Sequence, residues 1–160
     1  MATETYVALA TTTVTGSAAA SLIVSSLPST YRDLIMVIDG VSTPSDSYFE
    51  MRFNGDTTTS NYFHVYAQGN GSITASNDAN DNDGPFIGTS QSNAILQFMD
   101  YSATDKHKTC LMRFSSASSL VGMIAFRWAN TSAITSIELY DAGGDDFAVG
   151  TTLSVYGIEA

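Results

Sequence analysis

The side chains best suited to acid–base and nucleophilic chemistry are few and scattered in this sequence. It has two histidines, His64 and His107, one cysteine, Cys110, and no serine in a G-x-S-x-G pattern. His107 lies between Lys106 and Lys108 and is expected to be solvated at the entrance to a strand. Because nucleophilic catalysis needs a base held beside its nucleophile, this pattern predicts no catalytic residues and a protein that is not an enzyme.

Paired carboxylates are a second catalytic arrangement, since glycoside hydrolysis uses two of them. Among sixteen Asp and Glu residues, Glu50 on an expected strand and the nearby Asp56 are the first candidates. Acidic side chains that point to solvent from a sheet give the same pattern, and a glycosidase cleft usually takes more chain. Solvated acids are therefore the favoured interpretation.

The segment Asn77–Gly84 (NDANDNDG) raises a calcium hypothesis, because calcium prefers the oxygen ligands that Asp, Asn and backbone carbonyls supply. It departs from the EF-hand pattern: with Asp78 in the first position, the sixth is Asp83 and not glycine. Asn and Asp are also common in turns for conformational reasons alone. We expect a polar loop without a metal or cofactor, with calcium binding as the alternative.

An aromatic stretch contains the best candidate contact surface in the sequence. Alternation places Tyr62, His64 and Tyr66 on one face of an expected strand, and Phe63 and Val65 on the other. The Phe63 face is predicted to join the core, which leaves the Tyr–His–Tyr face for a partner. Half-buried residues with satisfied hydroxyl groups are the alternative interpretation.

The elements that position these residues are short extended segments separated by Gly, Asn, Asp, Pro and Ser, without a helical period. This spacing predicts one domain over residues 1–160, a jelly-roll-like β-sandwich of about eight to nine antiparallel strands. The longest exposed loop is expected at Gln68–Gly84, and the Gly-Gly pair in Asp141–Asp146 indicates a turn. The extended segments are Tyr6–Thr13, Ala20–Ser25, Asp33–Gly40, Tyr48–Asn54, Asn61–Ala67, Ser92–Tyr101, Lys108–Ser115, Leu120–Ala129, Ile134–Tyr140 and Leu153–Ile158.

Alternation within these segments also predicts the core. One face of the segment Leu120–Ala129 carries Ile124, Phe126 and Trp128. Two sheets that present such faces bury a shared core about 10 Å thick. Opposite this face we expect Phe49, Met51, Phe53, Leu139 and Val155.

The charge and the distribution of apolar residues limit the partners and the location expected for the protein. Six Lys and Arg residues against sixteen Asp and Glu give a net charge of −10, and the cations are scattered. Nucleic-acid binding needs clustered cations, so it is not expected. No apolar run approaches the roughly 20 residues of a membrane span, and the start lacks the basic region of a signal peptide. The lone Cys110 is expected to be buried and fits maturation in a reducing cytoplasm.

Several segments together resemble a group of small structural proteins from tailed double-stranded DNA phages, including phages of cyanobacteria. They occur in the same order as in that group and cover most of the chain. The group often has a smaller, less acidic loop where this chain has Asn77–Gly84. The segments are Ser25–Leu34 (SSLPSTYRDL), Phe53–Tyr62 (FNGDTTTSNY), Asp100–Arg113 (DYSATDKHKTCLMR), Ser132–Leu139 (SAITSIEL) and Phe147–Ile158 (FAVGTTLSVYGI).

The resemblance implies a jelly-roll-like sandwich in the virion, similar to capsid decoration (cement) proteins, which are often trimers on the shell. We therefore expect a protein that stabilises the capsid from outside, away from the genome, and that is assembled in the host cytoplasm. Its expected partners are the major capsid protein and copies of itself in a homotrimer. The alternative is a tail fibre or spike component that binds a glycan on the host surface.

Overall fold

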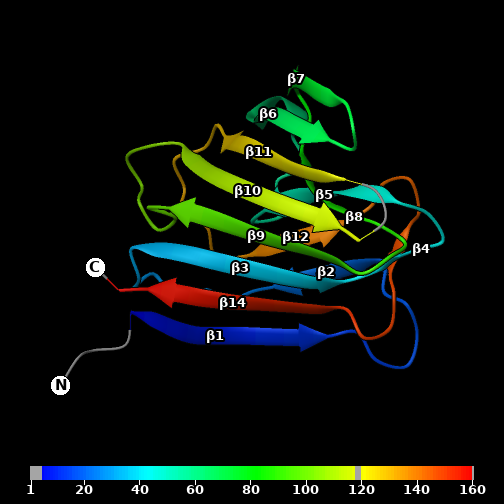
Figure 1. The fold of residues 1–160 in the computed structure, drawn as a ribbon. Coiled ribbons are helices and arrows are strands. Elements are labelled where there is room, and N and C mark those ends of the chain that lie inside the picture. Colours follow the sequence, from blue (N-terminus) through cyan, green and yellow to red (C-terminus); the bar gives the residue numbers. More distant parts are fainter. Residues whose placement is uncertain (1–4, 118–119, 160) are drawn as a thin grey trace.

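The computed structural model describes residues 5–117 and 120–159, and two antiparallel sheets dominate it (Figure 1). The larger sheet has eight strands, in the spatial order β1 (Tyr6–Thr13), β14 (Thr152–Ile158), β3 (Asp33–Gly40), β9 (Ser92–Met99), β10 (Lys108–Ser116), β11 (Val121–Trp128), β6 (Tyr62–Gly69) and β7 (Ile73–Ala79). The smaller sheet has four, in the order β2 (Ser21–Val24), β12 (Ile137–Tyr140), β5 (Ser47–Phe53) and β8 (Asp83–Ile87).

Two short elements complete the structure. Strands β4 (Ser42–Thr43) and β13 (Asp146–Phe147) pair with each other, and residues Thr59–Asn61 form one turn of 3₁₀ helix. In the described part of the chain, no helix has the length and apolar character needed to cross a membrane.

The predicted all-β sandwich is confirmed. Figure 1 shows the larger sheet across the front, with strands of the smaller sheet behind it. Strands β1 and β3 have the predicted bounds, and the side chains of β3 point in turn to either side of the sheet. The described residues form fourteen strands, which is more than expected. The strands that lie outside the ten predicted segments are β4, β7, β8 and β13, and each is either two residues long or rich in turn-forming residues.

The core lies between the two sheets, as predicted. Phe53 of β5 meets Phe126 and Trp128 of β11, with ring centroids 5.9 and 5.4 Å apart. Phe49, Met51 and Leu139 of the smaller sheet are also fully buried. The expectation for Val155 is wrong in one respect: it is buried, but it lies in β14 of the larger sheet and not opposite that sheet. Alternation predicted that Val155 faces inward but carried no information about its sheet.

The predicted exposed loop at Gln68–Gly84 is wrong. Its first part completes β6, a turn at Asn70–Ser72 follows, and β7 then pairs antiparallel with β6. Every residue of β7 is exposed, which explains its loop-like composition. The strand forms because β6 offers it a free edge, and a single sequence does not reveal such a pairing.

Candidate docking surface

The structure reverses the predicted faces of β6. Tyr62, His64 and Tyr66 point into the sandwich, and Tyr62 and His64 each expose only 2% of their surface. Phe63 and Val65 point outward, and Val65 is 46% exposed. The register with β11 explains the reversal, because Tyr62 and His64 lie beside the buried Trp128 and Phe126. The expected Tyr–His–Tyr contact face is therefore part of the interior.

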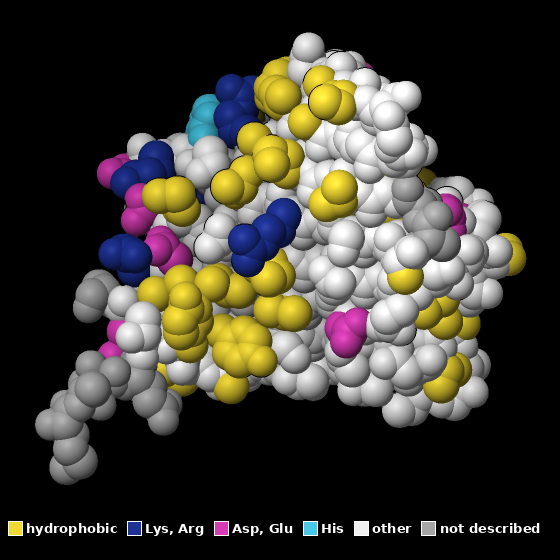
Figure 2. All heavy atoms as spheres, in the orientation of Figure 1, with side chains coloured by type: hydrophobic (Ala, Val, Ile, Leu, Met, Phe, Trp, Pro, Cys, Tyr) yellow, Lys and Arg dark blue, Asp and Glu magenta, His cyan; other side chains and the backbone are white. Residues whose placement is uncertain are grey.

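A different apolar surface is open to solvent, on the side of the larger sheet that faces away from the smaller sheet. We call this side the outer face. One row across it runs through Ile35, Gln97, Leu111, Ala125 and Val65 on five neighbouring strands. Figure 2 shows apolar side chains gathered on this side of the molecule, with Lys or Arg among them.

Two hollows lie on the outer face. The larger has a volume of about 590 Å³, and its walls include Phe63, Met99, Leu111, Ala125 and Ile158. The smaller hollow, of about 200 Å³, is lined in part by Ile95, Leu111 and Met123. Met99, Leu111 and Met123 each expose more than half of their surface. Side chains of this kind, left bare on the surface of a monomer, are typical of a site that another molecule covers.

Two arginines project from the same face. Arg113 follows the buried Met112 on β10, and Arg127 follows the buried Phe126 on β11, so both point outward. Arg127 lies over the ring of Phe63, with its guanidinium carbon 5.7 Å from the ring centroid.

The other four cations of the chain are already engaged. Arg32, Arg52 and Lys106 pair with carboxylates at 2.7, 3.1 and 3.2 Å, and the buried Lys108 ammonium donates to two backbone carbonyl oxygens. Within residues 5–117 and 120–159, neither Arg113 nor Arg127 has an acidic partner within 4 Å. The outer face thus combines apolar surface with Arg113 and Arg127, and it also carries Asp33 and Asp39 of β3, of which Asp33 pairs with Arg32.

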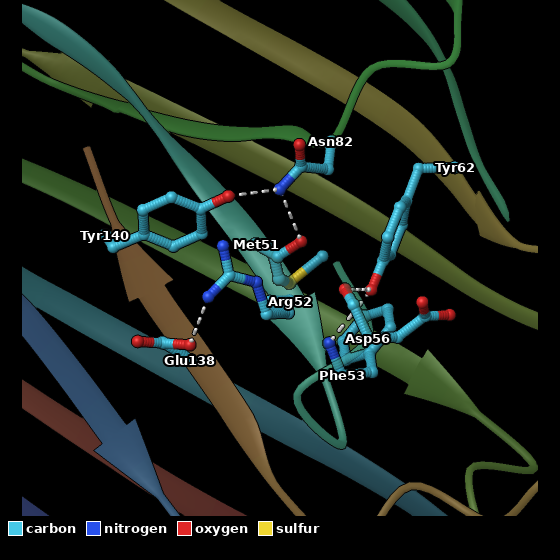
Figure 3. A network of polar contacts seen from close by, with 8 residues as sticks. All are labelled: Met51, Arg52, Phe53, Asp56, Tyr62, Asn82, Glu138 and Tyr140. Carbon is cyan, nitrogen blue, oxygen red and sulfur yellow. Dashed lines mark hydrogen bonds and ion pairs between the residues drawn. The ribbon is translucent and has the colours of Figure 1, made fainter. Parts of the chain in front are cut away.

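The candidate acid Asp56 has a structural role (Figure 3). Its carboxylate accepts hydrogen bonds from the Trp128 indole, the Asn61 amide and the Thr58 backbone N–H at 2.7 to 2.9 Å. Partial burial acts to raise the pKa of Asp56, but these hydrogen bonds outweigh it and lower the pKa overall. Its backbone carbonyl also accepts from the Tyr62 hydroxyl at 2.9 Å.

Glu50, the other candidate acid, lies on β5 and accepts a hydrogen bond from the Ala142 backbone N–H at 3.0 Å. Burial, with a smaller effect from Asp141 and Asp81, raises the pKa of Glu50. It shares no hydrogen-bonding partner with Asp56. The structure therefore gives the two carboxylates separate roles. His107, on the loop before β10, is exposed, whereas Cys110 is buried as expected and burial raises its pKa.

The segment Asn77–Gly84 is not one loop. It comprises the end of β7, a short connection and the start of β8. Figure 3 shows how Asn82 fixes the connection: its amide donates to the Met51 carbonyl at 3.2 Å and to the Tyr140 hydroxyl at 3.1 Å. Beside it, Arg52 stacks on Tyr140. Within the described residues, no three His, Cys, Asp or Glu side chains are grouped to hold a metal ion.

Sequence reasoning missed the outer face, although a signal for it exists. Segments such as DLIMVIDG in β3 and AILQFM in β9 are nearly continuous apolar runs and not strict alternations. Strands with such runs are typically covered on both sides. Here the smaller sheet covers one side and the described residues leave the other side open.

Comparison with known proteins adds little to this description. No family model and no curated protein matches the chain. The solved structures that match include a double mutant of the alginate lyase Aly36B bound to an alginate trisaccharide, with 9% identity over 93% of this chain and 80% of that chain and a TM-score of 0.31. They also include the PL-14 alginate lyase from Aplysia kurodai, with 9% identity over 82% and 70% of the two chains and a TM-score of 0.30. Similarity at this level carries no argument about function.

Proposed function

We propose that this protein is a capsid decoration protein of a tailed phage and binds the outside of the shell through its outer face. The observation that carries the proposal is the unpartnered apolar surface across β3, β9, β10, β11 and β6, with its two hollows. A binding protein that works without catalysis needs such a surface, and burying it supplies the association energy. The resemblance to phage virion proteins supports the capsid shell as the proposed binding partner.

The chemistry of the outer face indicates what it contacts. Arg113 and Arg127 would lie against carboxylates of the major capsid protein, while Leu111 and Met123 would bury apolar side chains. The negative charge elsewhere on the molecule keeps decorated particles from clumping. Many copies on one particle strengthen weak single contacts through multivalency, and a homotrimer, which is part of the proposal, adds to this effect.

The test uses two matched substitutions and purified capsids that lack the protein. Leu111 on the outer face and Ile23 on the smaller sheet are both 54% exposed, so Leu111→Glu and Ile23→Glu cost the fold about equally. We expect Leu111→Glu to abolish capsid binding and protection against heat, and Ile23→Glu to retain both. Equal capsid binding by the two variants would show that the outer face is not the capsid-binding surface.

The copy number of the wild-type protein in virions tests whether the protein is a component of the shell. We expect a number comparable with that of the major capsid protein, and imaging should place the protein on the outside of the shell. A copy number typical of tail proteins would contradict the proposal and favour a tail fibre or spike component.

A further inference from the structure

A polar cavity of about 130 Å³ lies at the opposite side of β6 from the outer face. The strands of both sheets contribute to it: His64, Tyr66 and Gln68 come from β6, Asp78 from β7, and Tyr48 and Asp83 from β5 and β8. Asp78 is the cross-strand neighbour of His64, and its side chain is 51% exposed, so the cavity opens to solvent beside it.

Several residues that line this cavity carry buried polar atoms without partners. Such atoms are normally hydrogen-bonded in folded proteins. Among the described residues, six buried side-chain nitrogen or oxygen atoms have no hydrogen-bonding partner, and three of them belong to cavity residues: Tyr48 Oη, His64 Nδ1 and Gln68 Oε1. His64 is 2% exposed. A cavity lined by several polar side chains of this kind is typical of a ligand site.

The walls accept hydrogen bonds and carry negative charge. Gln68 Oε1 and the carboxylates of Asp78 and Asp83 are acceptors, and among the described residues no Lys or Arg lines the cavity. His64 Nε2 lies 3.7 Å from Asp78 Oδ2. Burial, together with the charges of Asp81 and Glu50, raises the pKa of Asp83 to about 7, as expected for a carboxylate that is partly buried among like charges.

We propose that this cavity binds a protonated primary amine. An alkylammonium group has three hydrogen-bond donors and no acceptor, which complements these walls. The rings of Tyr48 and Tyr66 add aromatic surface of the kind that attracts a cation. The cavity volume suits an ammonium group with a short stem that enters beside Asp78. The amine comes either from a free alkylamine or from a lysine side chain of a partner, and the site is independent of the role in a virion.

The experiment follows the ring signals of His64 by NMR while the folded protein is titrated with methylamine hydrochloride at about pH 8. At this pH Asp83 is mostly ionised and the amine is protonated. Sodium chloride at equal ionic strength is the control. We expect saturable shifts with methylamine only. Shifts that are equal in both titrations would overturn the proposal.

Substitutions locate the binding. Asp78→Asn removes one charged acceptor from an exposed strand, so the variant should fold. Loss of a charge-assisted hydrogen bond weakens binding about tenfold or more, which we expect for Asp78→Asn. The matched control Asp105→Asn, at an exposed site outside the cavity, should bind as wild type does. Equal affinities of the Asp78→Asn and Asp105→Asn variants would overturn the assignment.

A parallel titration with Nα-acetyl-lysine amide distinguishes the two sources of the amine. Tighter binding than methylamine assigns the cavity to a lysine side chain, and equal or weaker binding assigns it to a free amine. If neither amine binds while calcium does, the cavity is a cation site of another kind and the proposal is wrong.

Discussion

Buried polar side chains differ in how their hydrogen bonds are satisfied. Lys108 is 1% exposed, and burial lowers its pKa, yet its ammonium donates to the Lys106 and Thr131 carbonyl oxygens. Asp56 is likewise surrounded by donors. His64 Nδ1 and Tyr48 Oη have no such partner within the described residues. Substitutions at Lys108 or Asp56 should therefore act on folding, whereas Asp78→Asn at the cavity should act on the proposed amine binding.

The raised pKa of Asp83 predicts that the stability of the fold depends on pH. Because burial and the neighbouring charges of Asp81 and Glu50 raise the pKa of Asp83 from 3.8 to about 7, the folded protein holds a proton there that the unfolded chain releases near pH 4. The contribution of Asp83 to the free energy of unfolding is therefore full at low pH and is lost as the pH rises from about 4 to 7. Asp83→Asn removes this loss.

Urea unfolding of wild type and the Asp83→Asn variant at about pH 4 and pH 8 tests this expectation. Relative to wild type, the variant should gain stability as the pH rises between these values. Asp105→Asn, at an exposed site, serves as the control and should not change the slope. The same pH dependence in wild type and the Asp83→Asn variant would show that the carboxyl group titrates normally in the folded protein.

At the scale of single elements, the larger sheet uses both of its sides. In β10, Cys110, Met112 and Phe114 are buried, while Leu111 between them is 54% exposed on the outer face. Strand β6 shows the same division with polar aromatic residues inside. Tyr62 can lie there because its hydroxyl donates to the Asp56 carbonyl and accepts from the Phe53 N–H.

Two adjacent substitutions in β11 test which side is the core. Phe126→Asp places an unpaired charge among Phe53 and Tyr62, so we expect the free energy of unfolding to fall by about 3 kcal/mol or more. Ala125→Asp, one residue earlier, points to the exposed outer face and should cost about 1 kcal/mol or less. Chemical denaturation measures both. Similar losses would mean that the two sides are equally buried.

At the scale of the whole molecule, the charges are unevenly distributed. The net charge is −10, yet two arginines without acidic partners in the described residues project from the outer face. In the proposed capsid binding, attraction between these two arginines and carboxylates of the shell would help to guide encounter.

The association rate with capsids should therefore fall as salt is added, since salt screens charges over about 10 Å at 0.1 M. Replacing both Arg113 and Arg127 by alanine should lower the rate at low salt and remove most of the salt dependence. Lys106→Ala, at an exposed cation already paired with Asp100, is the matched control and should behave nearly as wild type. The association rates are measured with capsids immobilised on a sensor surface. An unchanged salt dependence in the double variant would show that the two arginines do not contribute to docking.

Local patterns along the chain were enough to predict the strand-rich fold, most strand positions and the inward direction of residues such as Phe53, Phe126 and Trp128. These follow from an apolar side chain at every second position, which is a local property. Only the tertiary structure decided that β7 pairs with β6, that Tyr62 and His64 lie inside, and that Val155 belongs to the larger sheet. Alternation divides a strand into two faces but does not say which face is covered. Which face is covered depends on strand register and on neighbours distant in sequence. The same long-range contacts form the polar cavity and leave the outer face uncovered by the described residues.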